Sequence, residues 1–314
     1  MRAGLVGSSP PPQTCDLLMF CVEMERHGDL QQTLTLNNGV TMPLLGLGTF
    51  RLRGLENVIQ AVDAALKFGY RSFDTASVYR NEGDLGQALR QLLPKYNLSR
   101  TDVFITTKLA PVDMGEGARE ACLKSLAELG CEYLDLFLIH WPGKQGWRSD
   151  DIRNQEARKE SWKALEDLYQ AGTIRALGVS NYTTSHLTDL LGSCCIPPAV
   201  LQVEFHPRLP QLDLLNFCKK HGIHLQAYSS LGCGDLLKKD EVTKVAKIHG
   251  CSPSQILLLW ALRQGVGVIP KASVPERIQE NIGVWGFDMS DEEAETLRGD
   301  GTEKRYCWDP TGVI

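Results

Sequence analysis

Short apolar runs alternate with amphipathic stretches along most of this chain. The run over 133–140, which reads YLDLFLIH, is almost continuously apolar, as is typical of a strand that is buried on both faces. Eight runs of this kind predict eight strands, over residues 44–49, 70–74, 103–109, 133–140, 174–181, 200–206, 224–231 and 266–271.

Stretches with helical period lie between most of these strands, for example over 58–68, 118–129, 161–170 and 212–220. The alternation predicts an α/β fold in which helices cover a parallel sheet. Eight strand–helix units in about 280 residues match a closed (β/α)8 TIM barrel in count and in size. Ahead of the first unit, TLTLNNGVTMP predicts an N-terminal β-hairpin that turns at Asn38 and Gly39. Since no linker divides the rest, we expect one domain over 33–314.

A doubly wound dinucleotide-binding sheet also alternates strands and helices, so it must be weighed. Its fingerprint is G-x-G-x-x-G after the first strand. Gly46 and Gly48 begin such a motif, but Arg51 stands where the third glycine belongs. Two later G-x-G pairs fail in the same way, and no Walker A loop or H-E-x-x-H motif occurs. The barrel is therefore favoured.

Composition narrows the setting of this barrel. The net charge is −5 with no block of like charge, which argues against nucleic acid or a membrane as a partner. None of the ten cysteines forms a C-x-x-C pair, so we expect free thiols, no metal site and a reducing, cytoplasmic location. The longest apolar runs are too short to span a bilayer. Residues 1–32, rich in Pro, Gly and Ser at the start, predict a disordered N-terminal extension.

Polar residues stand at the carboxyl ends of the predicted strands, where the active site of a barrel gathers. Lys108 is notable because it lies within an apolar strand, where an unpaired charge is costly to bury. Asp74, at the end of the neighbouring strand, is the obvious partner, and Tyr79 follows it closely. His140 closes the most apolar strand, whereas His206, before a proline, is interpreted as structural. Together these ends outline a proton-donor site.

Seven segments of the sequence are similar to those of a known protein family. From about Thr33 to the C-terminus the chain resembles the aldo-keto reductase superfamily, whose landmarks it matches in order and spacing: GYRSFDTASVYRNE, TTKL, YLDLFLIHWP, IRALGVSN, LQVEFHP, YSSLG and IPKASVPERIQEN. The resemblance covers about nine tenths of the chain. It implies a (β/α)8 barrel that binds NADPH without a Rossmann motif, and a catalytic tetrad of Asp74, Tyr79, Lys108 and His140.

The resemblance also implies a role for each tetrad member. Tyr79 is the expected general acid, although a free tyrosine has a pKa of about 10. Lys108 is expected to lower that pKa, by roughly 1–3 units for one close opposite charge, while Asp74 orients the lysine. His140 is expected to donate a hydrogen bond to the substrate carbonyl oxygen.

For the cofactor, the resemblance implies NADPH held by a set of residues spread over the strand ends. Ser180, Asn181 and Gln202 would bind the nicotinamide carboxamide, and Tyr228 would stack on its ring. Lys271 and Arg277 would pair with the 2′-phosphate and favour NADPH over NADH; Ala272 stands where many relatives carry a serine, which weakens this preference. The full expected set is Gly48, Thr49, Asp74, Ser180, Asn181, Gln202, Tyr228, Ser229, Leu231, Gly232, Lys271, Arg277, Glu280 and Asn281.

The expected substrate pocket is small, open and lined by Phe50, His140 and Trp141, since the segment 143–156 and the C-terminal tail are both short. It suits short aldehydes, α-dicarbonyls such as methylglyoxal, or aromatic aldehydes better than steroids. We expect a monomer that reduces small carbonyls. The alternative is an NADPH-binding regulatory or sensing subunit with little turnover. A metal-dependent hydrolase would need His and carboxylate clusters that His140 and His206 do not supply.

Overall fold

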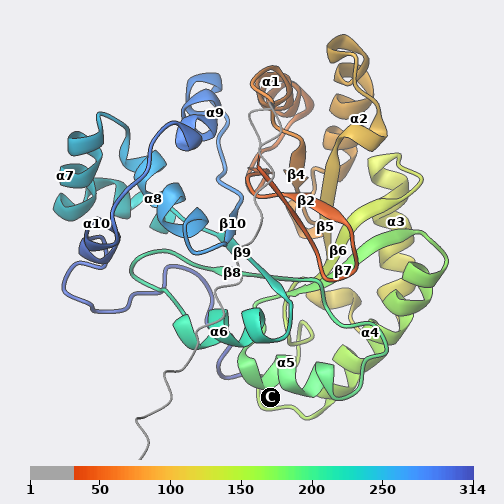
Figure 1. The fold of residues 1–314 in the computed structure, drawn as a ribbon. Helices are drawn as coiled ribbons and strands as arrows, with labels where there is room; N and C mark the ends of the chain where they lie inside the picture. Colours follow the sequence, from red (N-terminus) through yellow and green to blue (C-terminus); the bar gives the residue numbers. More distant parts are fainter. Residues whose placement is uncertain (1–31) are drawn as a thin grey trace, which may run out of the picture.

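Eight parallel strands form one sheet in the computed structural model, which describes residues 32–314 (Figure 1). The strands neighbour one another in chain order, from β3 to β10, as the predicted barrel requires. They are β3 (Leu47–Gly48), β4 (Ser72–Asp74), β5 (Phe104–Leu109), β6 (Leu134–Ile139), β7 (Ile174–Ser180), β8 (Val200–Glu204), β9 (His224–Tyr228) and β10 (Gly267–Val268). The sequence predicts disorder over residues 1–32, and residues 1–31 lie outside the part of the chain that the structure describes.

The first and last strands close the sheet on itself. Leu45 forms a parallel bridge with Val268, and Gly48 forms one with Lys271, more than 200 residues later in the sequence. The amide of Val268 donates to Leu44 O over 2.7 Å. A Cβ at Gly48 would lie 2.6 Å from Ile269 O, so this close approach requires glycine. The predicted (β/α)8 barrel is therefore confirmed.

The predicted N-terminal hairpin is also present. Strands β1 (Thr33–Thr35) and β2 (Thr41–Pro43) pair antiparallel across a turn in which Gly39 has φ 85°. From this hairpin, Leu36 and Met42 pack with Leu136 and Leu138 in a small core of their own. Leu136 and Leu138 alternate with residues that face the helices, which explains why this strand is apolar at nearly every position.

Helices surround the sheet (Figure 1). They are α1 (Leu55–Lys67), α2 (Glu82–Leu92), α3 (Ala118–Leu129), α4 (Arg153–Gln170), α5 (Thr184–Leu191), α6 (Leu212–Lys220), α7 (Asp240–His249), α8 (Pro253–Leu262), α9 (Pro275–Ile282) and α10 (Asp291–Thr296). No helix within 32–314 is long and apolar enough to cross a membrane.

Helix α4 begins two turns before the predicted start at 161. Its first turns are mostly polar, so apolar periodicity does not reveal them. They are nevertheless held by polar contacts: Arg158 Nη1 donates to Pro142 O over 2.9 Å and to Ile314 O over 2.8 Å. Arg158 is only 5% exposed. Burial of polar rather than apolar side chains therefore fixes this end of the helix.

After α10 the chain returns across the strand ends. We call residues 303–314 the C-terminal segment. It is attached near β8, where the amide of Lys304 donates to Arg208 O over 2.7 Å. Its last residue is attached beyond β6, where the amide of Ile314 donates to Ser149 O over 3.0 Å. The segment thus spans part of the barrel mouth.

Candidate active site

A buried ion pair lies at the carboxyl ends of β4 and β5. Lys108 has no exposed surface, and its Nζ lies 2.7 Å from Asp74 Oδ1. The same ammonium donates to Thr75 O over 2.8 Å and lies 3.5 Å from the Tyr79 hydroxyl. The structure therefore brings Asp74, Lys108 and Tyr79 together, and the charge that looked costly in the sequence is paired.

The loop that carries Tyr79 is fixed by buried polar contacts. Tyr79 ends the short 3-10 turn Ser77–Tyr79, and Arg80 follows in the left-handed conformation with φ 58°. Asn81 Nδ2 donates to Thr49 O and to Leu52 O, and Asn81 Oδ1 accepts from the Thr75 hydroxyl over 2.6 Å. Asn81 was not identified from the sequence. Nothing in the sequence indicates its role beyond its position two residues after Tyr79.

The electrostatics of Tyr79 differ from the expectation. Burial raises the pKa of the Tyr79 hydroxyl well above 10, and the Asp74 carboxylate raises it further. The pKa therefore shifts upward, opposite to the lowering that a single positive charge at Lys108 would produce. Lys108 is held by the carboxylate of Asp74, so its charge does not offset the effect of burial on the phenol. Burial in turn lowers the pKa of Lys108, and Asp74 opposes that shift. Tyr79 is thus a neutral phenol with its proton available.

His140 follows β6 directly and faces Tyr79. The centroids of the two rings are 5.8 Å apart, and the rings are nearly perpendicular. Burial, aided by the charge of Lys108, lowers the pKa of His140 to about 3. The imidazole is therefore neutral near pH 7 and carries one N–H that can donate to a carbonyl oxygen.

Two groups of hydrogen-bonded polar side chains from β7, β8 and β9 lie beside the ion pair. Gln202 Nε2 donates to Asp74 Oδ2 over 2.8 Å. The Tyr228 hydroxyl donates to Asn181 Oδ1 over 2.6 Å, and Asn181 Nδ2 donates to Ser180 Oγ and to His140 O. Thus the residues expected to hold a nicotinamide lie beside those expected to move the proton.

A second group of expected cofactor residues lines a cavity of about 290 Å³ near α8 and α9. Lys271 and Arg277 supply cations there, and neither forms an ion pair within residues 32–314. Glu280, Asn281 and Leu231 line the same cavity. Two unpaired cations around a hollow of this size fit the phosphate-bearing end of a dinucleotide.

The turn after β9 connects the two groups. Ser229 and Gly232 both have positive φ, 50° and 55°. A Cβ at Gly232 would lie 2.5 Å from Leu236 Cγ, so the tight turn excludes larger residues. Glycine is therefore required at position 232 of the expected pyrophosphate loop, because Leu236 and Tyr306 fill the space that a side chain would need.

Two aromatic residues flank the opening. Phe50 is 42% exposed, and its ring centroid lies 5.1 Å from that of Tyr79. Trp141 is partly exposed beside His140. Between Phe50 and the ion pair, Thr49 is fully buried and donates its hydroxyl to Asp74 O over 2.9 Å. Phe50 thus lies against Tyr79 and is open to solvent.

A further buried carboxylate, Glu204, was not identified from the sequence. His206 Nε2 lies 3.0 Å from Glu204 Oε1, and both side chains are fully buried. The amides of Tyr306 and Cys307 also donate to this carboxylate, over 2.6 and 3.0 Å. The structural interpretation of His206 fits this contact. Glu204 attaches the C-terminal segment to β8.

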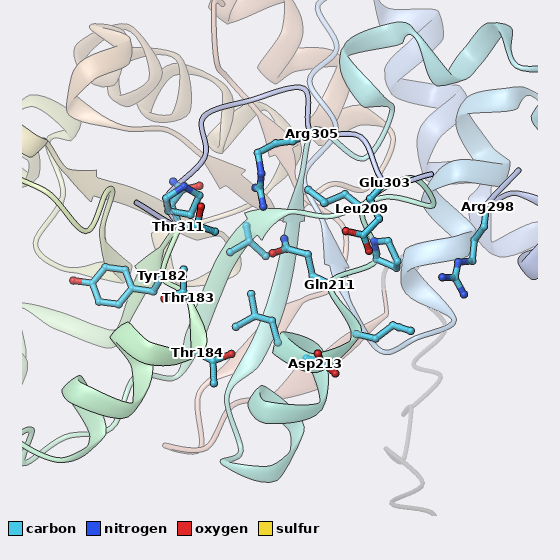
Figure 2. Close-up of a pocket in the computed structure, with 16 residues that line it drawn as sticks. Tyr182, Thr183, Thr184, Leu209, Gln211, Asp213, Arg298, Glu303, Arg305 and Thr311 are labelled. Atoms are coloured by element: carbon cyan, nitrogen blue, oxygen red, sulfur yellow. The ribbon is translucent and has the colours of Figure 1, made fainter. Parts of the chain in front are cut away.

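Another cavity, of about 490 Å³, lies away from the ion pair. Figure 2 shows Arg305 and Thr311 of the C-terminal segment on one side of it and Thr184 and Asp213 on the other. Of the expected site residues only Asn181 lines it. Its volume therefore does not locate the chemistry, which the ion pair beside Tyr79 indicates better.

Comparisons with known proteins give one consistent answer. A model described as the Aldo/keto reductase family matches residues 44–299. The glyoxal reductase of Bacillus subtilis is 42% identical over 286 residues, covering 91% of this chain and 98% of that protein. Among solved structures, an aldo-keto reductase named MGS-M4, from a deep-sea metagenome library, is 38% identical with TM-score 0.81, covering 90% and 99%. The aldose reductase of Schistosoma japonicum is 37% identical with TM-score 0.80, covering 87% and 93%.

Proposed function

The chain belongs to the aldo/keto reductase family of oxidoreductases, which act on carbonyl groups, and from that premise we propose that it reduces aldehydes and small ketones, including α-dicarbonyls, to alcohols with NADPH. The observation that carries the proposal is the buried lysine. Lys108 touches both the Asp74 carboxylate and the Tyr79 hydroxyl, at 2.7 and 3.5 Å. This arrangement serves a proton donor that must briefly hold negative charge.

NADPH, when bound, supplies the hydride that the carbonyl carbon accepts. Tyr79 then donates its hydroxyl proton to the carbonyl oxygen as that oxygen gains electrons. The phenolate left behind can accept a hydrogen bond from the Lys108 ammonium, whose charge Asp74 maintains. The neutral His140 donates its N–H to the same oxygen and aligns it. General acid catalysis of this kind contributes about 10²–10⁴-fold.

We propose that the cofactor is held by the residues expected from the sequence. Ser180, Asn181 and Gln202 bind the carboxamide, and Tyr228 stacks on the nicotinamide ring. Ser229 to Gly232 enclose the pyrophosphate. Lys271 and Arg277 pair with the 2′-phosphate, and Glu280 and Asn281 contact the adenine. Ala272, which is buried, offers no hydroxyl to that phosphate.

The substrate class follows from the open, aromatic entrance at Phe50 and Trp141. The name of the Bacillus subtilis relative, a glyoxal reductase, supports α-dicarbonyls as substrates. We further propose a monomer of the cytoplasm. The eight cysteines of the described residues are all free, which is consistent with a reducing compartment.

The test is the loss of NADPH absorbance with purified protein and a panel of carbonyls: methylglyoxal, phenylglyoxal, 4-nitrobenzaldehyde and a steroid ketone. The proposal predicts turnover of the small carbonyls, with the alcohol as product, and a much higher KM for the steroid. Tight binding of NADPH without turnover of any of them would contradict it. That outcome would favour a cofactor-sensing subunit instead.

A further inference from the structure

Two buried glutamines lie side by side on β8 and β9. Gln202 and Gln226 are partners in the strand register, and they are 2% and 1% exposed. Gln226 precedes Tyr228 by two residues and therefore lies on the same face of β9. It lies deeper in the barrel than Tyr228, one residue pair away from the expected nicotinamide site. Neither the sequence nor the proposed mechanism gives it a role.

Hydrogen bonds determine which way the Gln202 amide faces. Asp74 Oδ2 lies 2.8 Å from it, and a carboxylate can only accept, so the amide nitrogen must face Asp74. The second N–H of the same nitrogen donates to Gln226 Oε1, also over 2.8 Å. Both donors of Gln202 are thus used. Within residues 32–314, its Oε1 accepts no hydrogen bond and is free for a ligand.

We propose that Gln226 is a positioning residue that fixes Gln202 Oε1 toward the NH2 group of the nicotinamide carboxamide. The inference rests on the proposed function. Without the acceptor on Gln226, one N–H of Gln202 is left unpaired in a buried site, which is unfavourable. The Gln202 amide is then held by Asp74 alone and can rotate about that single hydrogen bond, so its oxygen is no longer fixed toward the cofactor. Gln226 itself touches neither cofactor nor substrate and acts only through Gln202.

The test compares NADPH with its reduced 3-acetylpyridine analogue, in which a methyl group replaces the carboxamide NH2. Binding of each is measured by quenching of protein fluorescence. The wild type is expected to bind NADPH about tenfold more tightly than the analogue, the worth of one good hydrogen bond. In Gln226→Leu this preference is expected to fall toward one, through weaker NADPH binding, and the KM for NADPH rises while kcat stays within about twofold.

Two matched variants complete the design. Gln226→Glu keeps an oxygen acceptor in either protonation state and is expected to retain the preference. Gln226→Met keeps the volume without the acceptor, and it replaces Gln226→Leu should that variant fail to fold. A tenfold preference that survives in Gln226→Leu and Gln226→Met would overturn the inference, because Gln226 would then serve packing alone. A wild type that binds both cofactors equally would overturn it too. A wild type that binds neither contradicts the proposed function itself.

Discussion

At the scale of single residues, Lys108 and Asp74 form a buried ion pair whose charges are costly to separate. Both are buried, so removal of one partner leaves an unpaired charge. We predict that Lys108→Met loses turnover by at least about 10²-fold and loses about 3–5 kcal/mol of stability. The measurements are the rate with methylglyoxal and urea unfolding.

The double variant Asp74→Asn/Lys108→Met serves as the control. It removes both charges, so stability is expected to return toward the wild type while turnover stays low. If the single Lys108→Met variant were as stable and as active as the wild type, the ion pair would have neither role.

The pH dependence of the rate also belongs to this scale. The pKa of His140 is lowered to about 3, so its neutral form persists down to about pH 4. The pKa of Tyr79 is raised well above 10, so its proton remains available at alkaline pH. We therefore predict that kcat/KM for reduction is flat from pH 6 to 9. The contrary result is a decrease in kcat/KM as the pH is lowered from 7 to 6 that disappears in His140→Gln. It would show that His140 titrates with an ordinary pKa.

At the scale of elements, Glu204 holds β8 and the C-terminal segment together. Burial raises the pKa of Glu204, but hydrogen bonds from His206 and from the amides of Tyr306 and Cys307 together lower it below its usual value. A lowered folded-state pKa contributes stability above the unfolded value of about 4.3 and loses it as the pH falls through the folded value.

We predict that Glu204→Gln loosens the C-terminal segment, because an amide can accept at only one of its two ends. The free energy of unfolding is expected to fall by about 1–3 kcal/mol at pH 7. Below pH 4 the variant is expected to lose less further stability than the wild type, because it has no carboxylate at this position to protonate. Limited proteolysis of the segment and thermal unfolding measure it. Glu303→Gln, on the exposed start of the same segment, is the control. Equal protease resistance in the two variants would refute the anchoring role.

The sequence predicted those elements whose residues carry a local signal. The barrel followed from eight apolar runs, and the pairing of Lys108 followed from a charge inside one of them. The first turns of α4 could not be predicted, because Arg158 is held by Pro142 and by the distant Ile314. The role of Glu204 could not be predicted for the same reason, since its partners Tyr306 and Cys307 lie about a hundred residues away in the sequence. Apolar periodicity reports burial but not which buried polar groups will meet.

At the scale of the whole molecule, the barrel depends on the seam between β3 and β10. A Cβ at Gly48 would lie 2.6 Å from Ile269 O, whereas one at Gly286 would meet no atom within 4 Å. We predict that Gly48→Ala lowers Tm by several degrees, for an overpacking cost of about 1–3 kcal/mol, and that Gly286→Ala does not. Calorimetry without ligand checks both. Equal Tm values would mean that the seam tolerates a wider spacing.

In the proposed reaction, Tyr79 gives its proton to a carbonyl oxygen beside bound NADPH. The most direct measurement is the rate of methylglyoxal reduction by Tyr79→Phe, with the Kd for NADPH measured on the same protein. We predict a loss of about 10²–10⁴-fold in rate and a Kd close to that of the wild type. Near-normal turnover in Tyr79→Phe would contradict it, because another group would then be the proton donor.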